Sequence, residues 1–96
     1  MRILFIMNCY NELPLLQWKH RYCEQFGFDM FVVDNMSNDS CVEYMKRNGI
    51  GHTQVDTDGA FDLRPLLAEM NTQLHRIRPD WFIYEVWMCF LLSKQT

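Results

Sequence analysis

Three short runs of apolar residues, at 3–7, 28–33 and 81–84, and a weaker fourth run at 52–55, alternate along the chain with segments whose apolar residues recur every three or four positions. A continuous apolar run suits a strand that is covered on both faces, as in parallel sheets, whereas the wider spacing is typical of helices. The order is therefore β-α-β-α-β-α-β. Right-handed crossovers would place helices on both sides of a mainly parallel sheet, which predicts an α/β three-layer sandwich.

The three segments between these runs carry helix signals. In the first, Gly27 marks the end of the helix, and one apolar stripe is formed by Leu15, Trp18 (or the stem of Lys19), Tyr22 and Phe26. The second segment begins at a cap formed by Asp39 or Ser40, and the third at Asp62. Leu66, Met70, Leu74 and Ile77 form the stripe of the third helix.

The chain has 96 residues and a mass of 11.6 kDa, so residues 1–96 form a single small domain. With 49% apolar and 22% charged residues, it belongs to the ordinary globular class rather than to the disordered or coiled-coil classes. A net charge of -3 and only short basic pairs argue against a nucleic acid partner, because phosphate binding needs a concentrated basic face.

No segment has the character of a membrane span or a signal peptide. The apolar run from 81 to 92 has twelve residues and is too short to cross a bilayer, and the N-terminal apolar run is a strand that is followed by no cleavage site. The four cysteines show no Cys-x-x-Cys spacing and mostly have apolar neighbours. We interpret them as reduced structural thiols and expect the protein to be cytoplasmic.

Polar residues follow each predicted strand, at 8–12, 34–37, 56–59 and 85. Because the carboxyl ends of parallel strands share one edge of the sheet, these residues would gather where open α/β sheets usually bind ligands. The glycine spacing of a dinucleotide-binding loop or a P-loop is absent, which argues against those two kinds of nucleotide site.

Three motifs in register make the site more specific. They are Ile-Leu-Phe-Ile-Met-Asn-Cys-Tyr-Asn-Glu at 3–12, Phe-Val-Val-Asp-Asn-Met-Ser-Asn-Asp-Ser at 31–40 and Arg-Pro-Asp-Trp-Phe-Ile-Tyr at 78–84. In order and spacing they resemble the family 2 glycosyltransferases and their close relatives. The resemblance covers residues 1–84, and residues 85–96 form a divergent apolar tail. It implies the N-terminal, nucleotide-sugar-binding half of a GT-A fold.

The resemblance also implies roles for single residues. Asp34 matches the carboxylate that accepts a hydrogen bond from a pyrimidine ring, and an ionised acceptor strengthens such a bond; the alternative is a loop or cap aspartate. Tyr10, Asn11 and Glu12 match the loop that holds base and ribose, although Asn11 and Glu12 can equally cap the next helix. Arg64 matches a basic contact to the nucleotide loosely, and its alternative is a solvated arginine in the first turn of a helix. Ser37 and Asp39 are assigned to shaping the turn.

The match breaks after the fourth predicted strand. Relatives place an Asp-x-Asp pair there, which holds Mg²⁺ or Mn²⁺ on the departing diphosphate, but the matching positions in this chain are Val86 and Met88. Glu85 is a single carboxylate one position early and is the weak candidate for a metal ligand. Whether this chain binds the family's metal is therefore left open, and no catalytic residue is assigned.

Two hypotheses for function follow. The first is the donor-binding half of an enzyme that transfers a sugar from a nucleotide diphosphate to an acceptor hydroxyl, with this chain alone inactive. The second is a non-catalytic α/β interaction module that associates through its apolar C-terminal strand. Under either hypothesis, an uncovered apolar segment at residues 81–92 would favour self-association.

Overall fold

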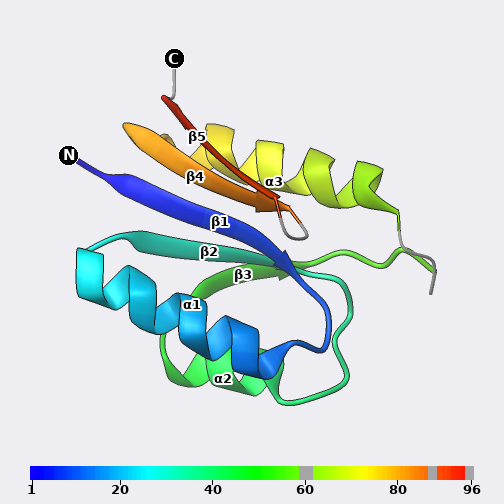
Figure 1. The fold of residues 1–96 in the computed structure, drawn as a ribbon. Coiled ribbons are helices and arrows are strands. Elements are labelled where there is room, and N and C mark those ends of the chain that lie inside the picture. The colour runs from blue at the N-terminus through cyan, green and yellow to red at the C-terminus, as the bar shows by residue number, and fades with distance from the viewer. Residues whose placement is uncertain (59–61, 87–88, 95–96) are drawn as a thin grey trace.

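A computed structural model describes residues 1–58, 62–86 and 89–94. In these parts of the chain, strands and helices alternate as the sequence predicts (Figure 1). The strands are β1 (Ile3–Cys9), β2 (Asp29–Asp34), β3 (Gly51–Gln54), β4 (Trp81–Val86) and β5 (Cys89–Lys94). The helices are α1 (Leu13–Phe26), α2 (Cys41–Arg47) and α3 (Leu63–Ile77).

The sheet has the order β3-β2-β1-β4-β5. Its first four strands are parallel, and β5 is antiparallel to β4. The chain first moves outward from β1 through β2 to β3 and then crosses to β4 on the other side of β1. Helices α1 and α2 lie on one face of the sheet and α3 lies on the other (Figure 1). The predicted α/β sandwich with a mainly parallel sheet is therefore confirmed.

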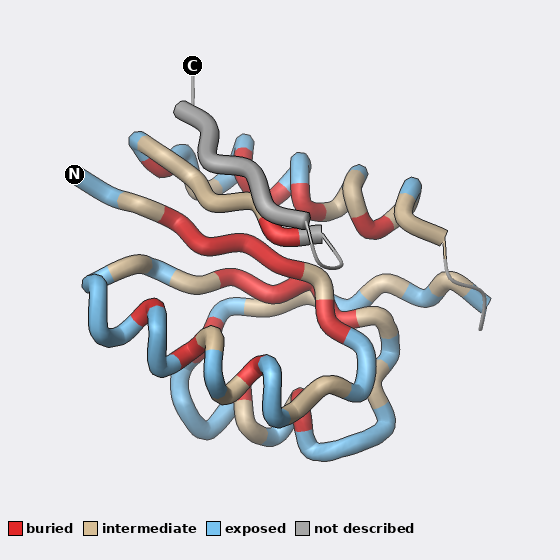
Figure 2. The backbone as a smooth tube through the Cα atoms, in the orientation of Figure 1, coloured by how far each residue is buried: buried red, intermediate tan, exposed pale blue. Residues whose placement is uncertain are grey.

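Consecutive residues of β1 pack into opposite layers of the core. Phe5 and Met7 belong to the cluster beneath α1 and α2, whereas Leu4 and Ile6 belong to the cluster beneath α3. All four side chains are buried, and Figure 2 shows the middle of β1 as buried. The central strand is apolar without alternation because both of its faces are covered.

The apolar stripe predicted for the first helix is not its buried face. Exposed fractions of 37% to 54% are found for Leu15, Trp18, Tyr22 and Phe26, and the helix buries Leu16, His20 and Cys23 instead. The aromatic rings of the stripe contact one another along the surface, with centroids 6.3 Å apart for Trp18 and Tyr22 and 4.8 Å apart for Tyr22 and Phe26. Leu16, His20 and Cys23 follow the same three- and four-residue spacing, so spacing alone does not distinguish the two faces.

The prediction of four strands is incomplete, because part of the divergent tail forms a fifth. Residues 89–94 return alongside β4 in antiparallel register, from the Val86–Cys89 pair to the Trp81–Lys94 pair. This pairing satisfies backbone groups on the outer edge of β4. Trp87 and Met88, which were expected in an apolar tail, lie outside the described residues, and self-association through 81–92 stays a prediction.

None of the helices in the described parts of the chain has both the length and the apolar character that a membrane span requires.

Candidate functional site

The loops after β1, β2 and β3 meet at one edge of the sheet. Cys9 at the end of β1 pairs in register with Asp34, and Asp34 pairs with Gln54 at the end of β3. The three strands therefore end at the same level, and the residues that follow them are neighbours (Figure 1). We call this the carboxyl edge. The strand order reverses between β1 and β4, and open α/β sheets bind their ligands at the carboxyl ends of the strands beside such a reversal.

The Asp34 carboxylate lies within this edge and is fully buried, with 0% of the residue exposed. Its Oδ1 accepts a hydrogen bond from the Ser37 hydroxyl at 2.6 Å. Its Oδ2 accepts one from the Ser37 backbone N–H at 2.9 Å and one from the Gln54 side-chain amide at 3.2 Å. A carboxylate offers about four acceptor positions, so these donors occupy most of them. Burial of the carboxylate is tolerated because it is hydrogen-bonded in this way.

Asn11 joins the loop after β1 to the loop after β2. Its backbone N–H donates to the Ser37 hydroxyl at 2.9 Å, and its side-chain oxygen accepts from the backbone N–H groups of Asn38 at 2.8 Å and Asp39 at 3.2 Å. The same Ser37 hydroxyl donates to Asp34. A continuous hydrogen-bonded path therefore connects Asn11, Ser37 and Asp34, and we call these three residues the loop network.

Each of the three loops at the carboxyl edge contains a non-glycine residue with a positive φ. The values are +50° for Asn11, +53° for Met36 and +58° for Asp58. Asn and Asp tolerate this left-handed conformation better than other residues, whereas a methionine adopts it rarely. Such residues cost about 1–3 kcal/mol each and cluster at binding and catalytic sites. Three of the four non-glycine residues with a positive φ in the described parts of the chain therefore lie at this edge, and the fourth, Arg78 at +55°, ends α3.

Two large side chains near the loop network face solvent. Tyr10 is 52% exposed and Met36, in the opposite loop, is 48% exposed. Glu12 is partly buried at the start of α1, where its carbonyl oxygen accepts from the Leu16 N–H at 2.9 Å and its side chain makes no capping hydrogen bond. The edge thus offers an aromatic ring and an apolar chain beside a buried acceptor.

Arg64 lies apart from the loop network. It is in the first turn of α3, and its guanidinium donates to Asp62 at 3.1 and 2.9 Å. These bonds hold the pKa of Asp62 below its ordinary value. Asp62 also accepts from the Arg64 backbone N–H at 3.0 Å, which confirms it as the cap of this helix. Among the described residues, no contact joins Arg64 to Asn11, Ser37 or Asp34.

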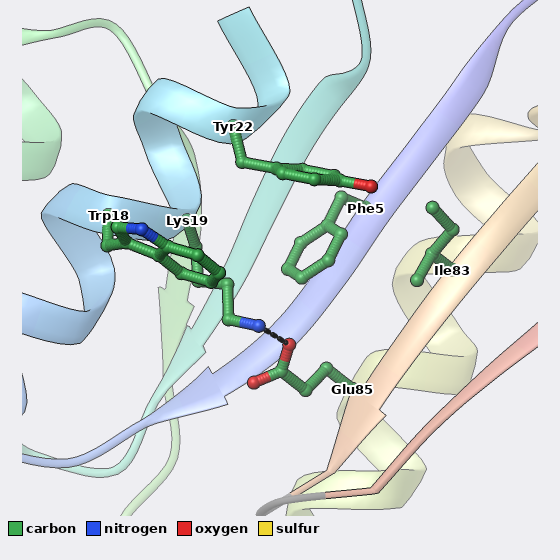
Figure 3. Close-up of a pocket in the computed structure, with 6 residues that line it drawn as sticks. All are labelled: Phe5, Trp18, Lys19, Tyr22, Ile83 and Glu85. Atoms are coloured by element: carbon green, nitrogen blue, oxygen red, sulfur yellow. Dashed lines mark ion pairs between the residues drawn. The ribbon is translucent and has the colours of Figure 1, made fainter. Parts of the chain in front are cut away.

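Glu85, near the end of β4, points toward Lys19 of α1 and into a groove between α1 and β4 (Figure 3). The groove has a volume of about 230 Å³ and is lined by Phe5, Trp18, Lys19, Tyr22, Ile83 and Glu85. The Lys19 ammonium lies 2.7 Å from the Glu85 carboxylate, and its positive charge balances the negative charge of Glu85. Within residues 1–58, 62–86 and 89–94, no group of three or more His, Cys, Asp and Glu side chains is arranged to hold a metal ion.

Two thiols pack together at the base of the loops. The sulfur atoms of Cys9 and Cys41 are 3.7 Å apart, and both residues are buried. Burial raises the pKa of Cys41 to about 11 and the pKa of Cys9 still further. Both thiols are therefore neutral at physiological pH, in agreement with the structural role predicted for them.

Sequence reasoning assigned Ser37 and Asp39 to shaping the turn, and the structure confirms this. Asp39 accepts from the Cys41 N–H at 3.0 Å at the start of α2. Gln54 and Met36 were not singled out. Strand register was the available signal for Gln54, because parallel pairing places the last residue of the third strand beside Asp34. No local pattern marks Met36, whose conformation follows from the path of the loop.

No family model matches the chain, and no curated protein matches it in sequence. Three crystal structures of S. aureus TarS 1–349 do match its fold. The TarS complex with UDP-GlcNAc gives a TM-score of 0.63 at 17% sequence identity, over 90% of this chain and 26% of the TarS chain. TarS alone gives 0.63 at 18% identity, and TarS with UDP gives 0.62 at 18% identity, each over 90% of this chain and 27% of the other.

This chain therefore spans about a quarter of the length of the TarS chains that it matches. At this level of identity, the likeness establishes the fold. The alternating strands and helices, with the parallel order β3-β2-β1-β4, match the N-terminal part of TarS, a GT-A glycosyltransferase. The resemblance to a GT-A fold that the three sequence motifs implied is confirmed.

Proposed function

We propose that this chain is the donor-binding half of a glycosyltransferase and that it binds a nucleoside diphosphate sugar at the carboxyl edge. The observation that carries the proposal is the loop network, in which Asn11, Ser37 and Asp34 hold the first two strand-end loops together. It lies where an open α/β sheet binds its ligands. The match to TarS, solved with UDP and with UDP-GlcNAc, supports a uridine nucleotide in particular.

The chemistry of Asp34 favours some bases over others. An ionised carboxylate accepts a strong hydrogen bond from an N–H group, and uracil and guanine both carry a ring N–H on the edge that pairs with other bases. Cytosine and adenine carry an unprotonated ring nitrogen at the same position, which would repel a carboxylate. A site built on Asp34 therefore favours uridine or guanosine nucleotides, while Tyr10 provides an exposed face on which the base can stack.

Sugar transfer needs groups that the described residues do not provide. A divalent metal on the diphosphate requires hard oxygen ligands. In this chain the matching positions are Val86 and Met88, and Glu85 is a lone carboxylate that is neutralised by Lys19. The donor set does not fit Mg²⁺ or Mn²⁺. The proposal is therefore nucleotide recognition, with no catalytic step assigned to this chain.

Calorimetric titration with UDP and CDP tests the proposal. The wild-type protein should bind UDP at millimolar concentration or better and CDP more weakly. Asp34→Asn removes the charge of the acceptor and should weaken UDP binding by about tenfold, as expected for a charge-assisted hydrogen bond. Asp29→Asn is the matched control, because Asp29 is exposed at the opposite end of the same strand and pairs with Arg2.

The outcome against the proposal is equally specific. Absence of UDP and GDP binding at millimolar concentration would remove the nucleotide site. Equal UDP affinity in the wild type and Asp34→Asn would remove Asp34 from it. Amide proton spectra of each variant show whether the fold is retained, so that a loss of binding is not mistaken for a loss of structure.

A second candidate function rests on β5. This strand is at the edge of the sheet, with β4 as its hydrogen-bonded neighbour. An edge strand presents backbone groups that a second copy can pair with, which would make the chain a non-catalytic interaction module. Size-exclusion chromatography separates the two candidates, because a discrete dimer with no affinity for nucleotides supports the module.

A further inference from the structure

Gln54 donates a hydrogen bond to the acceptor that the proposed nucleotide site depends on. Its side-chain amide donates to Asp34 Oδ2 at 3.2 Å, from the last residue of β3. Gln54 itself is exposed, whereas Asp34 is fully buried. One donor to the buried carboxylate therefore comes from a solvent-exposed residue, and it is an N–H group, the same kind of group that a uracil or guanine ring would present.

We propose that Gln54 is a displaceable competitor for the base, which occupies Asp34 Oδ2 in the empty protein and leaves it when a nucleotide binds. This inference rests on the proposed function and concerns the affinity and selectivity of the same site. The ligand class is a nucleotide whose base carries a ring N–H.

The other two donors to Asp34 are held more firmly. Both come from Ser37, which lies three residues along the chain, and the Ser37 hydroxyl is also bonded to the Asn11 N–H. Moving Ser37 would break the loop network. The bond from Gln54 is the longest of the three and involves a side chain with several rotatable bonds. It is therefore the bond that a ligand exchanges at the lowest cost.

The exchange also explains how the site could reject unsuitable bases. A uracil N–H replaces the amide N–H one for one, so the buried carboxylate keeps its hydrogen bonds. Cytosine has no ring N–H at that position and would leave a buried charge short of a donor, which is unfavourable. Cytidine nucleotides would therefore gain no hydrogen bond from Asp34, whether or not Gln54 is bonded to it.

Calorimetric titration of Gln54→Ala with UDP and CDP tests the proposal. Removing the competitor should tighten UDP binding by about three- to tenfold, since the ligand no longer has to displace an amide–carboxylate bond. CDP binding should change by less than that. Gln25→Ala is the matched control, because Gln25 is also exposed but lies in α1, and it should bind UDP like the wild type.

A second measurement needs no variant. In the wild-type protein, UDP should shift the side-chain amide proton resonances of Gln54 and leave those of Gln25 in place. If the wild type binds UDP and Gln54→Ala binds it equally or more weakly, the competitor role is overturned while the nucleotide site stands. If neither protein binds UDP or GDP, the proposed function fails and this inference fails with it.

Discussion

Lys19 of α1 and Glu85 near the end of β4 form an ion pair with 2.7 Å between Nζ and Oε2, and their side chains are only 18% and 11% exposed. The Lys19 ammonium also lies 5.0 Å from the centre of the Trp18 ring and 5.6 Å from that of Phe5. The pair ties the first helix to the fourth strand, which lies on the far side of β1 from β2. It also places the carboxylate considered for metal binding in an apolar groove (Figure 3).

Removing one member of this pair should destabilise the protein strongly. Lys19→Met leaves the Glu85 carboxylate without its counter-charge in a mostly apolar groove. Breaking a buried pair costs about 3–5 kcal/mol. Because both side chains are still partly exposed, we expect the free energy of unfolding to fall by about 3 kcal/mol. Urea unfolding at pH 7 measures it. Replacing both residues by methionine should restore much of the loss, because apolar side chains can fill the same groove; a double variant as unstable as Lys19→Met contradicts this account.

Adjacent leucines at the start of α1 give a direct test of which face of the helix is buried. Leu16 is fully buried, with 0% exposed, whereas Leu15 is 37% exposed. Leu16→Ala should lower the free energy of unfolding by about 2–5 kcal/mol because it creates a core cavity. Leu15→Ala should cost less than about 1 kcal/mol. Similar losses for the two variants, measured by urea unfolding, would mean that the helix is rotated from the orientation described.

The fold was predictable from sequence because the strands are buried on both faces. Unbroken apolar runs such as that of β1 identify parallel strands directly. The buried face of α1 was not predictable in the same way. The large aromatic side chains of the exposed stripe form a stronger apolar pattern than Leu16 and Cys23 do on the buried face. Which stripe fits over the sheet depends on the space between layers, and a single sequence does not contain that information.

The candidate site was predictable where it depended on local motifs. Asp34 ends β2 and Asn11 lies just after β1, and parallel strands bring these two positions to one edge. Gln54 joins the site only through the register of β3 against β2. Arg64 was included on a loose match, and the structure pairs it with Asp62 at the surface. Pairing Gln54 with Asp34, which is 20 residues away in sequence, requires the tertiary structure.

The stability of the protein should fall at alkaline pH because of its buried thiols. Burial raises the pKa of Cys23 to about 12 and that of Cys41 to about 11, from an ordinary value of 9.0. Above pH 9 the unfolded chain releases these protons while the folded protein keeps them, so the free energy of unfolding decreases from pH 9 toward pH 11. The full contribution is present below pH 9. Cys23→Ala should make this decrease shallower, as unfolding curves between pH 7 and 10.5 would show, and an unchanged slope would count against the assignment.

Ser37 should contribute to stability mainly through its hydroxyl, which bridges the two loops of the carboxyl edge. In Ser37→Ala the Asn11 N–H loses its acceptor and Asp34 Oδ1 loses the donor at 2.6 Å. Leaving such groups unpaired costs about 1–3 kcal/mol.

Ser40→Ala is the matched control, since Ser40 is exposed in the same loop and its side chain makes no capping bond. This variant should cost less than about 0.5 kcal/mol. Hydrogen exchange should show faster exchange of the Asn11 amide in Ser37→Ala alone. Equal protection of that amide in both variants and the wild type would mean that the Ser37 hydroxyl does not hold the two loops together.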